Sequence, residues 1–290
     1  MRVLAFGEIL WDIFLHEDRK EIGGAPFNFA AHMARMGAES SIASALGADT
    51  LGVQALKKAE EFGVASEYIS VTDKPTGYCE VTLKDGKPSY RLAENVAYDY
   101  IPKQSIKGKY DALYMGTLAQ RNRASRETLS TLIRETEVRE TFFDINIRPP
   151  FYTRAVLEQS LGQASILKLS REEKDFLSVL GIPESNTEQL CLRLKQEYPL
   201  KYILITMDKD GAALFDCTGE RFIYSKKPTG RVISTVGAGD SFSACFLYNY
   251  MNGRDLRQCL ERAVTLSDYV VTRLGAVPEY GCELLKEITE

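Results

Sequence analysis

Short apolar runs alternate with helix-like patterns along most of this 290-residue chain. This alternation constrains the fold more than any other feature, because it is typical of a mostly parallel sheet flanked by helices. The apolar runs predict strands at Val3–Phe6, Ser41–Ala45, Ala112–Met115, Phe142–Ile145, Ser165–Leu169 and Tyr202–Thr206. Helical spacing predicts helices at Asn28–Met36, Gly52–Phe62, Arg126–Arg134, Arg171–Leu180, Glu188–Glu197, Gly239–Met251 and Leu256–Arg273. With no long linker, residues 1–290 are expected to form a single α/β domain.

One region departs from this alternation. Gly77–Lys84 alternates polar and apolar residues, an Asp85-Gly86 turn follows, and Ser89–Leu92 returns. This pattern predicts a hairpin. The segment Ile9–Glu21 could pair with it. We expect segments at about 9–22 and 75–95 to form a small sheet off the main one. That sheet would be either a lid over a pocket or a contact between subunits.

Composition excludes several classes of function. The formal net charge is −4 and no dense Lys/Arg tract occurs, which argues against nucleic acid or an anionic membrane as a partner. No signal-peptide-like start or membrane-length apolar run is present. The six cysteines are scattered, which predicts free thiols and a cytoplasmic protein. With only two histidines, His16 and His32, a His-based metal site is not expected.

A glycine motif near the C-terminus carries the strongest chemical signal. Thr235–Phe242 reads TVGAGDSF and runs into an apolar, helix-like segment. Glycines let backbone N–H groups approach an anion, and a helix N-terminus favours phosphate. Donors at Gly237, Ala238 and Gly239 could stabilise a moving phosphoryl group while Asp240 takes the acceptor's proton. The alternative is a glycine turn with Asp240 as the helix N-cap.

Other candidate residues follow predicted strands or open predicted helices. Asp12 follows the first strand, at the end where open α/β sheets bind ligands, although it could be a solvated loop acid. In Gly23–Asn28 (GGAPFN), Asn28 could cap a helix, which is the favoured local interpretation. Alternatively, the glycines let a polyol lie against the backbone and the Asn28 amide binds its hydroxyls. Trp11 is expected to pack in the core or the lid.

Three further strand ends carry polar residues. Asp144, Asn146 and Arg148 should share one side of a strand end, where Arg148 could pair with a phosphate or merely with Asp144. Ser170 and Glu173 have the spacing of a capping box, and Glu173 could also serve a metal–phosphate site. The polar segment Thr206–Gly211 is, taken alone, a turn.

Together, these pieces resemble the ribokinase-like (PfkB-type) carbohydrate kinases over essentially the whole chain. The resemblance rests on Gly23–Ala30 with Gly37 and Gly47, and on Thr235–Phe242. The segments Gly7–Asp12, Pro75–Gly77, Glu94–Asp99, Gly116–Arg121 and Asp144–Arg148 look most like the bacterial fructokinase branch. The resemblance implies a three-layer ribokinase-like α/β sandwich with a β-lid, which could also join two subunits in a homodimer.

The resemblance also implies an ATP-dependent kinase that transfers the γ-phosphate to a sugar hydroxymethyl group, with fructose first. Alternatives are another sugar or sugar acid, such as ribose or 2-keto-3-deoxygluconate, or an impaired relative that only binds sugar or nucleotide. A dinucleotide-dependent oxidoreductase is disfavoured because no G-x-G-x-x-G follows the first strand, and no P-loop motif exists.

The resemblance assigns roles to particular residues. Asp240 matches the catalytic base, and the amides of Gly237, Ala238 and Gly239 match the anion hole. Asp12, Gly24 and Asn28 match sugar-binding positions, with Arg148 near the transferred phosphate. The nucleotide and Mg²⁺ side matches Lys168, Thr206, Gly211 and Glu173.

Three residues depart from the family pattern. Ser234 replaces a usual Asp that helps to organise a monovalent-cation site, which predicts weak or absent K⁺ activation. Ser170 replaces a usual Asn near the Mg²⁺ side, and Met207 replaces a usual Gly in the nucleotide loop.

Overall fold

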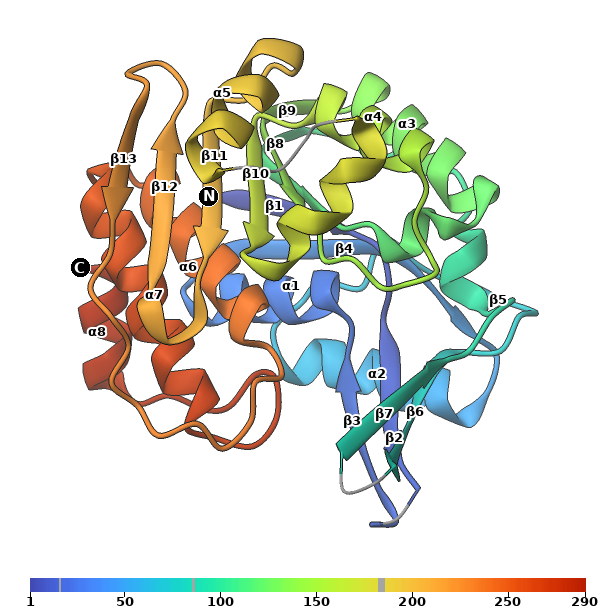
Figure 1. Cartoon of the computed structure of the whole chain (residues 1–290). Helices are drawn as coiled ribbons and strands as arrows, with labels where there is room; N and C mark the ends of the chain where they lie inside the picture. Colours follow the sequence, from blue (N-terminus) through green and yellow to red (C-terminus); the bar gives the residue numbers. More distant parts are fainter. Residues whose placement is uncertain (16, 85–86, 182–185) are drawn as a thin grey trace.

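The structure, a computed structural model, describes residues 1–15, 17–84, 87–181 and 186–290. It contains a large sheet covered by helices on both faces and a smaller sheet that projects from one end (Figure 1). The strands of the large sheet follow one another in the order β13 (Arg221–Tyr224), β12 (Ala212–Asp216), β11 (Tyr202–Thr206), β10 (Ile166–Ser170), β9 (Glu137–Asp144), β8 (Lys109–Met115), β1 (Arg2–Phe6), β4 (Glu39–Gly47) and β5 (Ile69–Thr72).

Neighbouring strands of the large sheet are parallel except at one side, where β12 is antiparallel to β11 and β13 is antiparallel to β12. Its interior strand β1, between β8 and β4, is buried on both faces, as expected for a parallel strand with a continuous apolar run. Leu4 and Phe6 belong to the core on one face, and Val3 and Ala5 to the core on the other. Two hydrophobic cores therefore sandwich the sheet.

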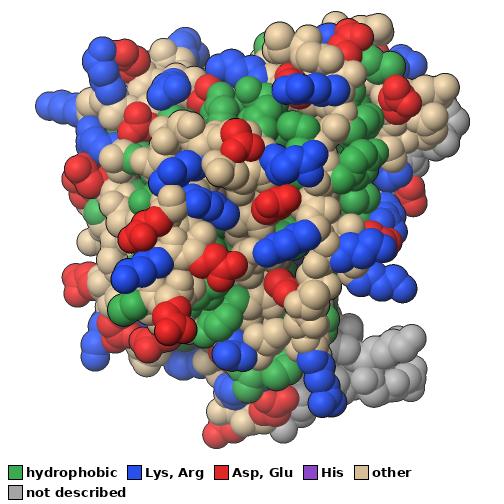
Figure 2. Space-filling model, turned by 90° about the vertical axis from the view of Figure 1, so that its left-hand side faces the viewer, with side chains coloured by type: hydrophobic (Ala, Val, Ile, Leu, Met, Phe, Trp, Pro, Cys, Tyr) green, Lys and Arg blue, Asp and Glu red, His purple; other side chains and the backbone are tan. Residues whose placement is uncertain are grey.

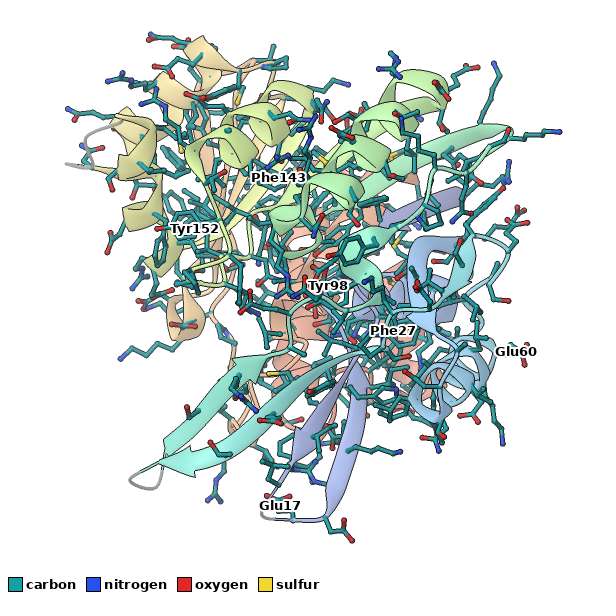
Figure 3. All side chains as sticks on the ribbon, turned by 90° about the vertical axis from the view of Figure 1, so that its right-hand side faces the viewer. Glu17, Phe27, Glu60, Tyr98, Phe143 and Tyr152 are labelled. Atoms are coloured by element: carbon teal, nitrogen blue, oxygen red, sulfur yellow. The ribbon has the colours of Figure 1, made fainter. Side chains whose placement is uncertain are left out.

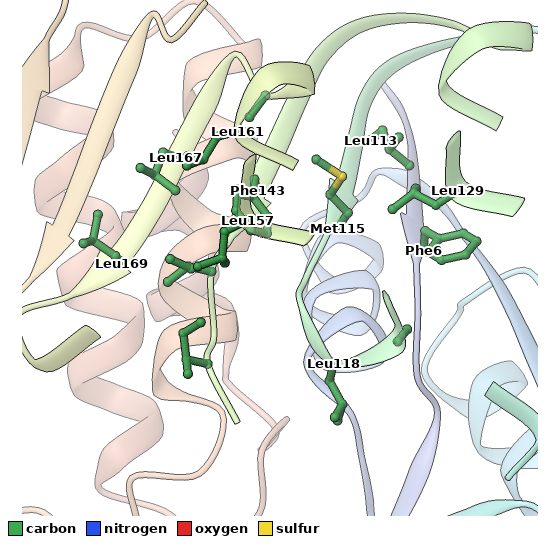
Figure 4. Packing of buried hydrophobic residues seen from close by; sticks show 14 of the residues in the cluster. Phe6, Leu113, Met115, Leu118, Leu129, Phe143, Leu157, Leu161, Leu167 and Leu169 are labelled. Carbon is green, nitrogen blue, oxygen red and sulfur yellow. The ribbon is translucent and has the colours of Figure 1, made fainter. Parts of the chain in front are cut away.

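Helices cover each core. One layer holds α3 (Arg123–Glu135), α4 (Arg154–Gln163), the 3₁₀ helix η3 (Glu172–Leu180) and α5 (Thr187–Glu197). Figure 4 shows Phe143 and Leu157 of this core facing each other between β9 and α4. The opposite layer holds α1 (Ala25–Arg35), α2 (Thr50–Glu61), α6 (Ala238–Met251), α7 (Leu256–Val271) and α8 (Cys282–Thr289). The predicted α/β sandwich is confirmed.

The small sheet has the strand order β3 (Arg19–Gly23), β2 (Leu10–Phe14), β6 (Gly77–Lys84) and β7 (Lys87–Leu92). Its strands come from the two segments that the sequence predicted, while the Asp85-Gly86 turn lies outside the described residues. Trp11 is buried, and its indole N–H donates to the carbonyl of Leu51 at 3.0 Å, so it packs the sheet against α2 as expected. Asp49 caps α2 and also accepts from the Thr76 amide at 2.8 Å, which anchors the start of β6.

All six strands predicted from the apolar runs are present, with small differences in their ends. Among the described residues, the prediction missed β5, β12, β13, α4 and α8. The predicted helix Arg171–Leu180 is a 3₁₀ helix.

Two interpretations of helix starts are wrong. Asn28 does not cap α1, because that helix begins at Ala25 after Gly24 as N-cap. Asp240 does not cap α6, because Gly237 is the N-cap and Asp240 is the third residue of the helix. Gly24 and Gly237 have φ of 107° and 79°, a region that glycine adopts readily, so these residues make the turns into the helices. Asn28 and Asp240 are thereby free for other contacts.

The surface agrees with the composition. Basic and acidic side chains are interspersed over the face of Figure 2, so neither sign dominates it. Within the described ranges, no helix is long and apolar enough to cross a membrane. All six cysteines are free thiols, and five of them are buried.

Candidate active site

Asp240 and Asn28, from helices α6 and α1, meet in the interior. The Asn28 amide group donates to the Asp240 carboxylate at 2.8 Å, and both side chains are buried. Burial raises the pKa of Asp240 to about 6, although the Asn28 hydrogen bond opposes this shift. The result is a carboxylate that is ionised near neutral pH yet basic enough to accept a proton.

Glu8 lies beside this pair and was not singled out from the sequence. It follows β1, is 4% exposed, and its Oε2 atom has no hydrogen-bond partner among the described residues. Burial raises the pKa of Glu8 to about 7, with a further contribution from the charge of Asp240. Gly24 lets Glu8 approach α1, because a Cβ at Gly24 would lie only 2.4 Å from the Glu8 carbonyl oxygen. The signal that could have found Glu8 is its position directly after a buried parallel strand.

Asp12 approaches the same space from β2 of the small sheet. It pairs in register with Glu21 and Cys79 of the neighbouring strands. Burial raises the pKa of Asp12 to about 6, and the negative charge of Glu21 adds to the shift. Asp12 therefore faces neighbouring charge and not open solvent, which excludes the interpretation as a solvated loop acid.

Tyr98 lies on the 3₁₀ helix η1 (Ala97–Tyr100). It borders the region around Glu8 and Asp12 at the point where the small sheet joins the body of the molecule (Figure 3). Its hydroxyl is buried with no hydrogen-bond partner in the described part of the chain. The Arg121 guanidinium lies 5.0 Å from the centre of its ring and pairs with Asp99 at 2.7 Å. These residues lie in the segments Glu94–Asp99 and Gly116–Arg121 that carry the resemblance, but the sequence assigned them no role, because nothing local marks them as neighbours.

The N-terminus of α6 presents backbone donors. The amides of Gly237 and Gly239 have no acceptor among the described residues, whereas Ala238 donates to the Thr235 carbonyl at 3.3 Å. Because the first amides of a helix have no intrahelical partners and carry partial positive charge, this turn can hold an anion. A Cβ at Gly239 would lie 2.9 Å from Lys168 Nζ, so an ammonium group lies beside the same turn.

Lys168 forms an ion pair with Asp144 and is shielded from solvent. Its ammonium lies 3.0 Å from Asp144 Oδ1, and both side chains are buried. Burial disfavours the charged ammonium, but Asp144 and Glu173 outweigh that effect and raise the pKa of Lys168. The second Asp144 oxygen accepts from Tyr114 and Ser243. The alternative pairing of Arg148 with Asp144 is therefore wrong.

A cavity of about 470 Å³ opens from the α6 turn. It is lined by all four residues predicted for the nucleotide and Mg²⁺ side and by Arg148, but not by Asp12, Gly24, Asn28 or Asp240. Its walls include Asn146, Arg148, Lys168, Glu173, Thr206, Gly211, Gly230, Val232, Ala238, Gly239, Phe242 and Asp268. The predicted residues thus form two adjacent groups that meet at the start of α6.

Arg148 joins the two groups. It lines the cavity, and its positive charge lowers the pKa values of Glu8, Asp12 and Asp240. Its Nη1 donates only to the Ile147 carbonyl at 3.2 Å, and it forms no ion pair within the described ranges. This guanidinium is therefore available to an anionic group bound in the cavity.

Ser170 and Glu173 exchange the two hydrogen bonds predicted for a capping box, although the N-cap of η3 is Arg171 and not Ser170. Glu173 Oε2 accepts from the Ser170 amide at 2.8 Å, and the Ser170 hydroxyl accepts from the Glu173 amide at 3.2 Å. The other oxygen accepts from the Ile147 amide at 2.7 Å. No cluster of three or more His, Cys, Asp or Glu side chains suited to a metal occurs among residues 1–15, 17–84, 87–181 and 186–290. Both carboxylate oxygens of Glu173 accept from backbone amides, which fix the side chain at the wall of the cavity.

Comparison with known proteins agrees with this geometry. The sequence pattern of the pfkB family carbohydrate kinases matches residues 15–279. An ATP-dependent 6-phosphofructokinase of Thermoanaerobacterium thermosaccharolyticum is 26% identical over 95% of this chain and 89% of its own length. Probable fructokinase-5 of Arabidopsis thaliana is 26% identical over 95% of this chain and 93% of its own length.

Solved structures show the same fold. A sugar kinase of Pyrococcus horikoshii, solved with ATP, is 25% identical with a TM-score of 0.81, over 99% of this chain and 98% of that one. A fructokinase double mutant of Vibrio cholerae, solved with fructose, ADP and potassium, has a TM-score of 0.82 at 21% identity, over 100% and 98% of the two chains. The ribokinase-like fold is confirmed, and the chain belongs to the pfkB family of carbohydrate kinases.

Proposed function

We propose that this enzyme transfers the γ-phosphate of ATP to a hydroxymethyl group of a sugar, with fructose as the first candidate. The observation that carries the proposal is the Asp240 carboxylate, held by Asn28 and placed three residues after Gly237 at the start of α6. A proton acceptor beside free helix amides is the arrangement that phosphoryl transfer to an alcohol needs.

The acceptor lies between the small sheet and the start of α1. Asp12, Gly24 and Asn28 bind its hydroxyls, and Asp240 removes the proton from the attacking hydroxyl. The segments at about 9–22 and 75–95 act as a lid of the single domain, residues 1–290. Lid closure excludes water, which would otherwise compete with the sugar for the phosphoryl group.

ATP occupies the cavity of about 470 Å³. Lys168, Thr206 and Gly211 contact the nucleotide, while the amides of Gly237, Ala238 and Gly239 stabilise charge on the transferred phosphoryl group. Arg148 meets that group on the acceptor side. Mg²⁺ on the ATP phosphates would neutralise their charge, and Glu173, with Asn146 nearby on the cavity wall, would hold its water shell. The free thiols support a cytoplasmic location.

The relatives named above act on different sugars, so the acceptor could be another sugar or a sugar acid, such as ribose or 2-keto-3-deoxygluconate. An impaired relative that only binds sugar or nucleotide is disfavoured, because the Asn28–Asp240 contact and the free amides of α6 are intact.

The test is ADP release from ATP·Mg²⁺ with a panel of sugars that begins with fructose and includes ribose and 2-keto-3-deoxygluconate. The proposal expects turnover that depends on the sugar. Absence of sugar-dependent ADP release across the panel, with binding of sugar or ATP retained, would support the impaired relative instead.

A further inference from the structure

Carboxylates dominate the acceptor side of the site. Glu8, Asp12 and Asp240 come from three separate parts of the chain, and Glu21 lies across from Asp12 on β3. Among the described side chains, Arg148 is the cation whose charge acts on Glu8, Asp12 and Asp240 together. Lys168 on the nucleotide side is already paired with Asp144 at 3.0 Å, and Arg121 with Asp99 at 2.7 Å. On the small sheet, Arg19 pairs with Glu17 and Glu21, Arg91 pairs with Glu80, and Lys20 donates to the Gln54 side chain at 2.6 Å.

Two of the unpartnered polar atoms here, Asn28 Oδ1 and the Oε2 of ionised Glu8, are hydrogen-bond acceptors, whereas the Tyr98 hydroxyl can also donate. The Asn28 amide nitrogen donates to Asp240, which leaves its Oδ1 atom buried without a partner among the described residues. Glu8 Oε2 is likewise buried and has no hydrogen-bond partner among the described residues. Buried polar atoms without partners are costly and few in folded proteins, so two beside one carboxylate require a reason. Each of these two oxygen atoms would be satisfied by a ligand group that donates a hydrogen bond to it.

The carboxylates and the two unpartnered acceptor atoms together define which ligands the acceptor side can bind. A sugar hydroxyl carries a proton to donate and no charge, so it satisfies Glu8 and Asn28. A carboxylate or a phosphate group offers oxygens without protons and brings negative charge toward Glu8 and Asp12. Like charges brought together away from water are strongly unfavourable.

We propose that this kinase accepts neutral polyols and rejects sugar acids and sugar phosphates, and that Glu8 is a residue that sets this specificity. This inference rests on the proposed sugar-kinase function. Glu8 suits the role because Gly24 lets it lie against the start of α1, where a Cβ at Gly24 would lie 3.2 Å from Glu8 Cγ, and because its charge interacts with that of Asp240. Asp12 provides the second negative charge, from the small sheet.

The experiment compares kcat/KM for fructose, fructose 6-phosphate and 2-keto-3-deoxygluconate at about pH 8.5, where Glu8 and Asp12, with pKa values raised by burial to about 7 and about 6, are both ionised. We expect the wild-type enzyme to favour fructose by about 100-fold or more over each anionic sugar, the scale of a like-charge penalty in a desolvated site. A wild-type enzyme that uses either anionic sugar as well as fructose, or better, would overturn the inference. If none of the three sugars, nor any other, supported turnover, the proposed function itself would fail, which is a distinguishable result.

Variants test the role of Glu8 directly. Glu8→Gln keeps size and removes the charge, so kcat/KM for the anionic sugars relative to fructose should rise about tenfold or more, mostly through KM for the sugar. KM for ATP should not change. Glu60→Gln makes the same charge change on an exposed turn of α2, far from this region in Figure 3, and should leave the ratio unchanged. Asp12→Asn provides a second variant should Glu8→Gln fold poorly. An unchanged ratio in a folded Glu8→Gln enzyme, checked by its thermal unfolding, would refute the assignment to Glu8.

Discussion

The ionisation of Asp240 should control the pH dependence of turnover. Its pKa of about 6, raised by burial, means that the carboxyl is protonated and unable to act as a base at lower pH. We therefore expect kcat to fall as the pH drops below about 6 and to be steady just above it. Glu8 has a higher pKa, about 7, so it is already largely protonated where Asp240 titrates, and Glu8→Gln should leave this fall near pH 6. A kcat that stayed constant down to pH 5 in wild type would contradict the role of Asp240.

Ser234 leads to a prediction about cations. Its hydroxyl accepts from the Val236 amide at 3.3 Å and offers no negative charge. A K⁺ ion near the start of α6 would therefore be held more weakly than beside a carboxylate. We expect little or no activation by K⁺, compared with Na⁺ at constant ionic strength, and clear activation in Ser234→Asp. Strong K⁺ dependence of the wild-type enzyme would show that backbone carbonyls suffice.

Single residues were predicted from the sequence as far as their neighbours along the chain define them. Asp12, Asn28 and Asp240 could be chosen because each stands next to a strand end or a glycine turn. Their partners could not, because the Asn28–Asp240 hydrogen bond joins residues 212 positions apart. Lys168 was assigned to the nucleotide side, but its partner Asp144 was missed for the same reason.

At the scale of elements, helix α1 carries a pH-dependent contribution to stability. Its residue His32 is buried, with Nε2 3.0 Å from the Ala276 carbonyl oxygen and Nδ1 3.4 Å from the Tyr280 hydroxyl. Burial lowers the pKa of His32 to about 4 from its usual 6.5. Between these values the unfolded chain binds a proton that the folded chain does not, so acidification favours unfolding.

We expect the free energy of unfolding of wild type, relative to His32→Gln, to fall by roughly 3 kcal/mol in all as the pH decreases from 6.5 to below 4. The difference between the two proteins is the quantity to measure, because Glu8, Asp12 and Asp240 have raised pKa values and act in the opposite direction. Denaturant unfolding at several pH values gives it. Parallel pH curves for the two proteins would show that His32 is not the source.

The small sheet should respond to the sugar if it is a lid. Its strands β2 and β6 are anchored at Trp11 and Thr76, so the rest of the sheet can move over the site. We expect hydrogen exchange of the amides at 77–82 and 89–92 to slow several-fold when fructose is added. Exchange that ignored sugar but slowed at higher protein concentration would favour a homodimer contact instead.

Local patterns predicted some elements better than others. The parallel strands were found because each is an apolar run of its own. Helix α4 was missed although Val156, Leu157 and Leu161 have helical spacing, because the helix has only 10 residues and the fourth position of its buried face is the polar Ser160. Strand β12 was missed because Thr206–Gly211 was interpreted as a turn and no element was assigned after it. In the structure the chain reverses at this turn, and β12 pairs antiparallel with β11.

At the scale of the whole molecule, the site forms where the C-terminal ends of several parallel strands of the large sheet lie side by side. Strands β1, β9, β10 and β11 end at or beside Glu8, Asp144, Ser170 and Thr206. The class of fold followed from the sequence, because alternating strands and helices allow few arrangements. The strand order and the meeting of α1 with α6 required the structure, since they depend on contacts between distant segments.

The measurement that tests the central claim most directly is the turnover of Asp240→Asn with ATP·Mg²⁺ and the best sugar of the panel. The Asn side chain keeps the size and can still accept the Asn28 hydrogen bond, but it cannot take a proton. The account predicts a fall in kcat on the order of 10²–10⁴-fold, with a modest change in ATP affinity and an unchanged fold. Near-wild-type turnover by this variant would contradict the account.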